Sequence, residues 1–288
     1  MNYRIQNEYL TAVIKDTGAE LCELTDKDNV QYIWTADPTY WGRHTPILFP
    51  LVGKVTGNAY TVNGQDYALG QHGFARDFMF QVESQSDDSI TFVLHSDEAT
   101  KKLFPYAFTL KVIYTLKEKT LAIGYEVINK DTEEMFFKIG AHPGFRCPLF
   151  EDETMEDYTL SFEKEEEVTF MPLTPEGYFT RATQKCITTP LALSPQLFAK
   201  DALVYGDFTS SFVTLTSKKH NKSIQVGFDG FPFLGIWSPL SPSPFVCIEP
   251  WFGHADYEDE GNEWTKKSDL NHLMPEQTFA CTHTITIQ

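Results

Sequence analysis

Apolar and polar side chains alternate with a period of two along much of this chain, and this pattern limits the fold more than any other feature. Between Phe108 and Leu116, every even position is apolar and most odd positions are polar. The segment 121–127 repeats the pattern after a short polar break. Successive side chains of a strand point to opposite faces of a sheet, so the two segments predict a β-hairpin.

Turn residues and further alternating runs extend the prediction to the whole chain. Asn63-Gly64 between two short apolar runs indicates a second hairpin, because Asn-Gly suits the positive φ angles of a type I′ turn. Further strands are predicted at 10–14, 19–25, 78–83, 90–95, 134–140, 212–217, 223–228, 233–238, 245–248 and 278–287. Helix signals are limited to 97–104, stopped by Pro105, and to a short helix starting at Ser194-Pro195.

No Gly/Ser linker divides the 288 residues, and the spacing of the predicted strands does not change along them. We therefore expect one all-β domain over residues 1–288, built as a large antiparallel sandwich with few short helices. The 23 Phe and 13 Tyr residues agree with a sheet protein.

The net charge of −17 disfavours a nucleic-acid partner and an anionic membrane surface, because both attract basic proteins. No run is long and apolar enough for a membrane span, and no signal peptide is readable. The five cysteines are widely spaced without a C-x-x-C motif, which predicts free thiols in a cytoplasmic protein. Phosphate-binding Gly-rich motifs, G-x-S-x-G and H-E-x-x-H are all absent.

Three segments carry the candidate chemistry: His72-Gly73-Phe74-Ala75-Arg76, His142-Pro143-Gly144-Phe145 and Cys247-Ile248-Glu249-Pro250-Trp251. Each histidine follows a predicted strand, where a side chain can reach a cleft while the sheet holds its backbone. Glu249 lies at the end of an apolar strand that Pro250 and Trp251 are expected to terminate. Two imidazoles and one carboxylate are groups suited to proton transfer near neutral pH.

These residues also have structural interpretations. A histidine at a strand end can simply cap a turn, and a buried Glu249 can form an ion pair with Arg43 or Arg76. His72, His142 and Glu249 together can also ligate zinc or iron. His283 shares a predicted strand face with apolar residues, and we interpret it as a core histidine.

Four tryptophans, Trp34, Trp41, Trp237 and Trp251, lie near these segments or near turns of the chain. Aromatic faces beside a few polar groups are typical of a sugar pocket, although core packing is the commoner role of each tryptophan alone.

The three segments, in this order, resemble those of the aldose 1-epimerase (galactose mutarotase) family, and most closely its shorter LacX-like branch. The segments 46–54 and 233–239 and the Asn63-Gly64 hairpin also resemble that branch. The resemblance implies a galactose mutarotase-like β-supersandwich. It also implies interconversion of the α and β anomers of a free hexose without metal or cofactor, by a monomer or a homodimer.

Residue by residue, the resemblance implies Glu249 as the general base, His142 as the general acid and His72 as a hydrogen-bonding partner of the sugar. It places Asp201 on sugar hydroxyls, and Trp237 joins the substrate-binding set. Lys54 stands where many relatives have an arginine, and lysine lacks the bidentate geometry of arginine.

Two other functions stay open. The segment ending in Arg76 also resembles hexose-6-phosphate 1-epimerases, in which this arginine helps to hold phosphate. A non-catalytic sugar-binding protein with the same cleft is the third possibility.

Overall fold

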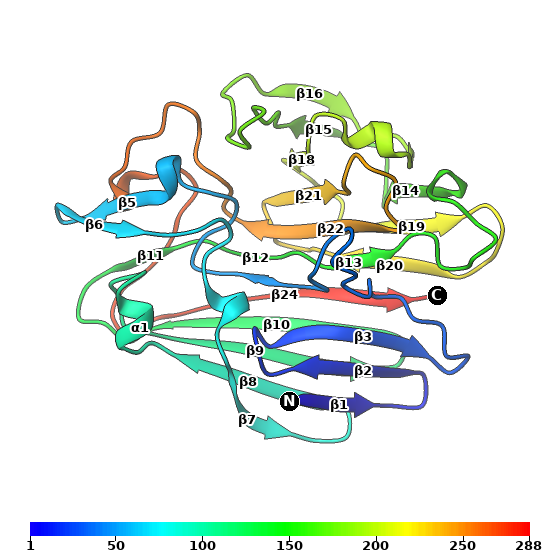
Figure 1. The fold of residues 1–288 in the computed structure, drawn as a ribbon, viewed down its shortest axis with the longest axis horizontal. Helices are drawn as coiled ribbons and strands as arrows, with labels where there is room; N and C mark the ends of the chain where they lie inside the picture. The colour runs from blue at the N-terminus through cyan, green and yellow to red at the C-terminus, as the bar shows by residue number, and fades with distance from the viewer.

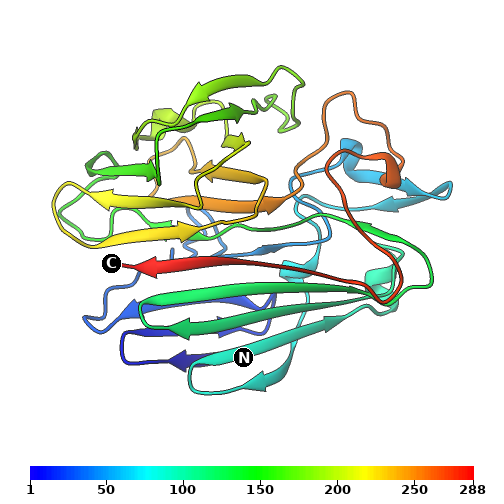
Figure 2. The same ribbon diagram turned by 180° about the vertical axis from the view of Figure 1, so that it is seen from behind.

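The computed structural model describes residues 1–288 and confirms the all-β prediction: two large antiparallel sheets form the body of the molecule. In Figure 1, β22 (Phe245–Phe252) crosses the middle, with β21 (Phe233–Trp237) above it and β24 (Thr278–Ile287) below. Figure 2 shows the nine-stranded sheet from behind, where the yellow, red and green strands follow one another. A three-stranded sheet packs on this larger sheet, since Tyr3 contacts Phe92 with ring centroids 5.5 Å apart.

The strands of the nine-stranded sheet, in spatial order, are β17 (Leu191–Ala192), β14 (Tyr158–Phe162), β19 (Phe212–Ser217), β20 (Ser223–Gly227), β24, β10 (Thr120–Asn129), β9 (Phe108–Lys117), β8 (Ser89–His95) and β7 (Gln81–Gln85). Those of the eight-stranded sheet are β16 (Gln184–Ile187), β15 (Glu167–Phe170), β18 (Leu203–Gly206), β21, β22, β12 (Ile139–Ala141) and β4 (Ile47–Leu48), with β13 (Gly144–Arg146) also paired to β22. The smaller sheets are β1 (Asn2–Gln6), β2 (Leu10–Lys15) and β3 (Glu20–Asp26); β5 (Ala59–Val62) and β6 (Gln65–Ala68); and β11 (Met135–Phe137) and β23 (Asn271–Leu273).

Both predicted hairpins are confirmed. The pairing of β9 with β10 starts with Lys117 opposite Thr120, and the even-numbered residues of β9 up to Leu116 are buried. Asn63 and Gly64 have φ angles of 51° and 77°, as a type I′ turn requires. One cluster of 61 buried apolar residues takes members from both large sheets and forms the core between them.

The predicted strand 134–140 is wrong as a single element. The chain leaves one sheet for another at Lys138, so that β11 pairs with β23 and β12 pairs with β22 and β4. The predicted strand 78–83 is also displaced, because residues 75–77 form the 3₁₀ turn η2 (Ala75–Asp77) and β7 begins only at Gln81.

Pro250 and Trp251 do not end their strand, contrary to the prediction, and β22 continues to Phe252. The Ile248 amide donates toward Pro143, so the nitrogen of Pro250, two residues on, faces the same side. On that side of β22, the pairing with β13 ends at Cys247 and the pairing with β12 starts at Trp251. Pro250 therefore lies at a gap in the ladder, where its missing N–H removes no hydrogen bond.

Helices are few, as predicted. The helix α1 (Glu98–Lys101) is shorter than the predicted 97–104 and carries a capping box between Asp97 and Thr100. The segment after Ser194 forms a 3₁₀ turn, η4 (Pro195–Phe198), without a side-chain cap. The other 3₁₀ turns are η1 (Thr56–Asn58), η3 (Met155–Asp157) and η5 (Trp264–Lys266). None of the helices combines the length and the hydropathy that crossing a membrane requires.

Candidate active site

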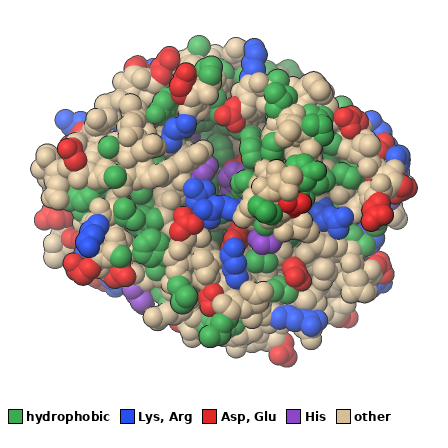
Figure 3. All heavy atoms as spheres, in the orientation of Figure 1, with side chains coloured by type: hydrophobic (Ala, Val, Ile, Leu, Met, Phe, Trp, Pro, Cys, Tyr) green, Lys and Arg blue, Asp and Glu red, His purple; other side chains and the backbone are tan.

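A cavity of about 630 Å³ opens on the face of the molecule seen in Figure 3, where histidine side chains lie in a hollow with Lys or Arg beside them. Every site residue predicted from the sequence lines this cavity: Lys54, His72, Arg76, His142, Asp201, Trp237 and Glu249. The fold thus brings together residues that lie up to 195 positions apart in the sequence.

Glu249 reaches the cavity because of the alternation along β22. Val246 and Ile248 belong to the core between the sheets, so Cys247 and Glu249 face the opposite side. Glu249 is only 2% exposed, and its Oε2 lies 3.3 Å from Nε2 of His142 without an aligned hydrogen bond. The neighbour of the Glu249 carboxylate is therefore an imidazole and not the permanently charged guanidinium of an arginine.

The alternative ion pair of Glu249 with an arginine is not formed. Arg43 binds Asp77 at 2.9 Å, and the Arg76 guanidinium donates to the carbonyl oxygen of Gln71 at 2.7 Å. The Nε of Arg76 is buried without a hydrogen-bond partner. Both guanidinium groups are thus held away from the carboxylate.

His142 follows β12 at the gap opposite Pro250 and lies within an aromatic cage. The indole of Trp41 stacks on its ring with centroids 4.8 Å apart and planes 28° apart. Trp237 and His72 meet the same ring edge-on, at 5.8 and 5.4 Å. These contacts fix the orientation of the imidazole, and the stacked indole face favours its protonated form.

His72 has its tautomer set by the backbone. The Gly53 amide donates to Nδ1 of His72 at 3.1 Å, so Nδ1 is unprotonated and Nε2 carries the ring proton of the neutral imidazole. The His72 amide in turn donates to the Gly53 carbonyl at 2.6 Å. His72 has a φ of 66°, and the following Gly73 passes so close to Phe49 that a Cβ would lie 2.2 Å from its carbonyl oxygen. A neutral His72 is thereby presented to the cavity as a hydrogen-bond donor.

Lys54 and Asp201 both lie next to Gly177 at another wall of the cavity. A Cβ placed on Gly177 would lie 3.2 Å from Lys54 Nζ and 4.0 Å from Asp201 Oδ2, so both polar groups adjoin this glycine. The ammonium also lies 5.2 Å from the centre of the Tyr178 ring. Lys54 forms no ion pair and Asp201 accepts only a local bond from Ala202, which leaves both groups available to a ligand.

Burial shifts the pKa values of Glu249 and His142 in opposite directions. It raises the pKa of the Glu249 carboxyl well above its usual value, and it lowers the pKa of His142 to about 3. Burial, together with the neighbouring His142, also holds the pKa of His72 well below its usual value. These shifts favour a carboxylic acid beside a neutral imidazole, so that the pair shares one transferable proton.

Three contributors to the site were not identified from the sequence. Gln71 and Glu176 line the cavity, and the thiol of Cys247 lies beside His142 and Glu249. Ligand atoms of His142, Cys247 and Glu249 all lie within 4.8 Å of one another, whereas His72 is not part of this group. Period-two alternation could have placed Cys247 beside Glu249, since the two are separated by one residue on the same strand.

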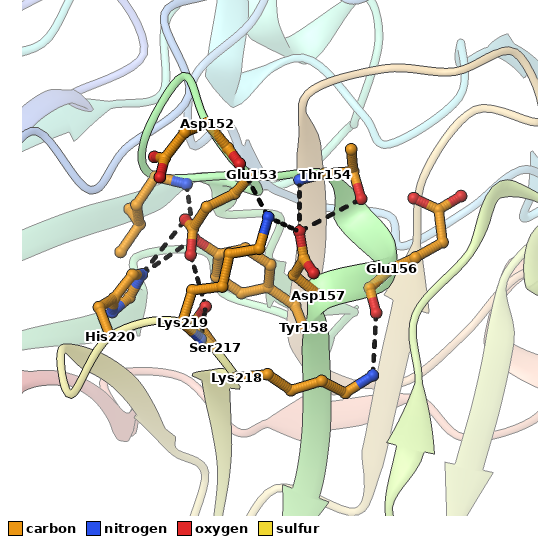
Figure 4. Close-up of polar contacts among 11 residues, drawn as sticks. Asp152, Glu153, Thr154, Glu156, Asp157, Tyr158, Ser217, Lys218, Lys219 and His220 are labelled. Carbon is orange, nitrogen blue, oxygen red and sulfur yellow. Dashed lines mark hydrogen bonds and ion pairs between the residues drawn. The ribbon is translucent and has the colours of Figure 1, made fainter.

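A second buried carboxylate, Glu153, lies in a polar cluster outside the cavity (Figure 4). It accepts hydrogen bonds from Tyr158 and, at 2.6 Å, from the Ser217 hydroxyl, and His220 lies 3.3 Å away. The serine hydroxyl donates to the carboxylate and not to the imidazole, so no serine–histidine nucleophile is formed. The cluster ties the loop before β14 to the end of β19 and serves structure.

Comparison with known proteins identifies a family whose description covers most of the chain. The family description of the aldose 1-epimerases matches residues 1–271. Protein LacX of Lactococcus lactis, chromosomal form, is 36% identical over 300 residues, covering 100% of this chain and 99% of that protein.

Two solved structures share the fold. One is a galactose mutarotase related enzyme from Lactobacillus acidophilus, 35% identical, with a TM-score of 0.96 over 100% of this chain and 97% of that one. The other is a galactose mutarotase-like protein from Lactobacillus casei, 33% identical, with a TM-score of 0.94 over the full length of both chains. The predicted galactose mutarotase-like fold is confirmed, and the chain belongs to the aldose 1-epimerase family.

Proposed function

We propose that the cavity is the active site of an aldose 1-epimerase that interconverts the α and β anomers of a free hexose. One observation carries the proposal: four buried polar atoms without hydrogen-bond partners belong to residues lining this cavity. They are Glu249 Oε2, His142 Nδ1, Trp251 Nε1 and Arg76 Nε; the Trp251 indole lies close enough to Glu249 to lower the pKa of its carboxyl, but it does not form an aligned hydrogen bond. Buried polar groups are normally paired, and a ligand rich in hydroxyl groups would supply the missing partners.

In the proposed mechanism, Glu249 takes the proton of the C1 hydroxyl and His142 protonates the ring oxygen. The C1–ring oxygen bond breaks, the carbonyl carbon rotates, and ring closure on the other face reverses both proton transfers. Each such group typically contributes about 10²- to 10⁴-fold in rate. The 3.3 Å between the two side chains suits proton transfer at neighbouring oxygens of one sugar.

The roles require a carboxylate and an imidazolium, whereas burial favours the neutral pair. Both arrangements hold one proton and differ only in its position. Sugar hydroxyl groups that donate to Glu249 favour the carboxylate. The Trp41 face favours the imidazolium. We infer that substrate binding moves the proton from Glu249 to His142.

The remaining predicted residues have substrate-binding roles in this scheme. His72 donates a hydrogen bond from Nε2, and Asp201 and Lys54 contact hydroxyl groups at the other wall. Trp237 supplies an apolar face for the CH groups of the ring.

Anomer exchange measured by NMR on a panel of free hexoses tests the proposal. Purified protein should shorten the exchange time of at least one hexose well below that in buffer, and Glu249→Gln should abolish the effect. Saturable sugar binding without faster exchange would instead identify a non-catalytic sugar-binding protein.

A hexose 6-phosphate is the second candidate substrate, because the cationic groups at the cavity are incompletely neutralised. Lys54 forms no ion pair, and the Nε of Arg76 lies 3.9 Å from the Asp77 carboxylate without a hydrogen bond. Charged donors of this kind suit a phosphate group. Preference for glucose 6-phosphate over glucose, lost in Arg76→Ala, would support this candidate, whereas equal use of both sugars would reject it.

A further inference from the structure

The thiol of Cys247 has no part in the proposed reaction, although it lies beside both reacting side chains. It is fully buried, and it precedes Glu249 by two residues on the same face of β22. A ring nitrogen of His142, the Cys247 sulfur and a Glu249 oxygen lie within 4.8 Å of one another. This fully buried free thiol packs in an apolar cluster with Trp34 and Phe245 and also has the ionisable neighbours His142 and Glu249.

The chemistry of these three atoms matches one class of ligand. Imidazole nitrogen, thiolate sulfur and carboxylate oxygen are the donor types that bind Zn²⁺. Glu249 Oε2 is buried and lacks a hydrogen-bond partner, and so does Nδ1, the other ring nitrogen of His142. His142 is 8% exposed and Glu249 2% exposed, so neither group has ready access to water as a substitute partner.

The spacing is also close to that of a zinc site. Bonds of about 2.0 to 2.3 Å in tetrahedral geometry place ligand atoms roughly 3.3 to 3.7 Å apart. The His142 Nε2–Glu249 Oε2 distance of 3.3 Å already meets this spacing. The widest separation, at most 4.8 Å, needs a side-chain shift of about 1 Å. His142 and Glu249 line the cavity, so the fourth tetrahedral position would open into it.

We propose that His142, Cys247 and Glu249 form a binding site for Zn²⁺, and that the bound ion blocks the acid–base pair. Metal binding itself is independent of the proposed function, whereas the inhibition rests on it. The ion replaces the thiol proton and the one proton held between His142 and Glu249, and both protons pass to the solvent. Zn²⁺ is thus an inhibitor of this site and takes no part in the reaction.

The proton balance makes the affinity depend on pH. Because Zn²⁺ displaces protons from the thiol and from the His142–Glu249 pair, zinc binding strengthens as the pH rises.

The test uses metal-free protein titrated with Co²⁺ and Zn²⁺. Co²⁺ reports a thiolate ligand through a charge-transfer band in the near ultraviolet, and calorimetry gives the zinc affinity. We expect the band in the wild type and its loss in Cys247→Ala. Changes in the outer shell of a metal site already weaken binding by about 10- to 100-fold, so loss of a ligand should weaken zinc binding at least about tenfold.

Cys147→Ala is the matched control, because this thiol is equally buried and belongs to no such group. It should keep the band and a zinc affinity within about twofold of the wild type. The wild-type Co²⁺ spectrum is decisive without any variant: absence of the thiolate band overturns the proposal, as does a band that persists in Cys247→Ala.

Anomer exchange with and without saturating Zn²⁺ separates this proposal from the proposed function. Each variant is compared with its own metal-free rate. Active protein that saturating zinc leaves unaffected refutes the inhibition. If metal-free protein is inactive but shows the Cys247-dependent band, the metal site stands and the proposed function fails.

Discussion

Glu249→Gln tests both the role and the protonation of the carboxyl group, because it keeps the side-chain shape and removes the ionisation. Burial raises the pKa of Glu249 well above its usual value, whereas in the unfolded chain this carboxyl titrates near about 4.3. Between these two pKa values only the folded protein keeps the proton. Raising the pH in this window therefore favours the unfolded state by about 1.4 kcal/mol per pH unit.

The wild type alone does not reveal this slope. His142, whose pKa burial lowers to about 3, contributes stability that is complete above its unfolded pKa of about 6.5 and is lost as the pH falls toward 3. Its slope opposes that of Glu249 between about pH 4.3 and 6.5. Glu249→Gln retains the buried His142, so both proteins carry a histidine slope, and comparing the two reduces its contribution.

Urea unfolding at a series of pH values, followed by tryptophan fluorescence, measures that difference. Glu249→Gln should match the wild type near pH 4 and become relatively more stable as the pH rises, by up to about 1.4 kcal/mol per unit. Its rate of anomer exchange should fall about 10²- to 10⁴-fold. A stability difference that does not change with pH would show that Glu249 is ionised in the folded protein, and near-normal turnover would refute its role as the base.

Glu153→Gln is the control for buried carboxyl groups in general. Although burial opposes it, hydrogen bonds from Ser217 and Tyr158 lower the pKa of Glu153. Its contribution to stability is therefore present above the unfolded pKa of about 4.3 and is lost as the pH falls through the lower folded pKa. Glu153→Gln should destabilise the protein at pH 7 and lose this effect in acid, opposite in sign to Glu249→Gln, with anomer exchange unchanged.

Three further outcomes follow from the geometry. The kcat/KM profile should show no loss of activity near pH 6.5 on the acid side, because His142 takes up a second proton only near its pKa of about 3. On the alkaline side, kcat/KM should fall as the pH passes the raised pKa of Glu249. Gly235→Ala places a Cβ 2.6 Å from the Trp251 ring and should cost about 1 to 3 kcal/mol in urea unfolding, whereas a wild-type-like midpoint would contradict this contact. Trp41→Leu should lower kcat about 2- to 30-fold by removing the stacked face on His142, with Trp41→Phe retaining most of the rate; equal rates in the two variants would exclude the cation–π contribution.

The sequence alone determined the strands whose alternation is strong and local. β9, β10 and the Asn63-Gly64 turn were predictable, because period-two burial and positive φ angles depend on neighbouring residues only. Local signals failed where the chain changes sheets at Lys138, and where η2 delays β7. The prediction that the strand ends at Pro250 also failed, because β22 tolerates this proline at the gap that β12 and β13 leave opposite it.

The candidate site also has one part that the sequence predicted and another that only the tertiary structure decided. Its residue types were readable from three short segments, and the family resemblance supplied their expected roles. Only the tertiary structure decided that Glu249 meets His142 and no arginine, that Trp41 stacks on the imidazole, and that Cys247 completes a group of three ligand atoms. Distances and desolvation depend on packing between segments more than 100 residues apart, and no local pattern in the chain encodes them.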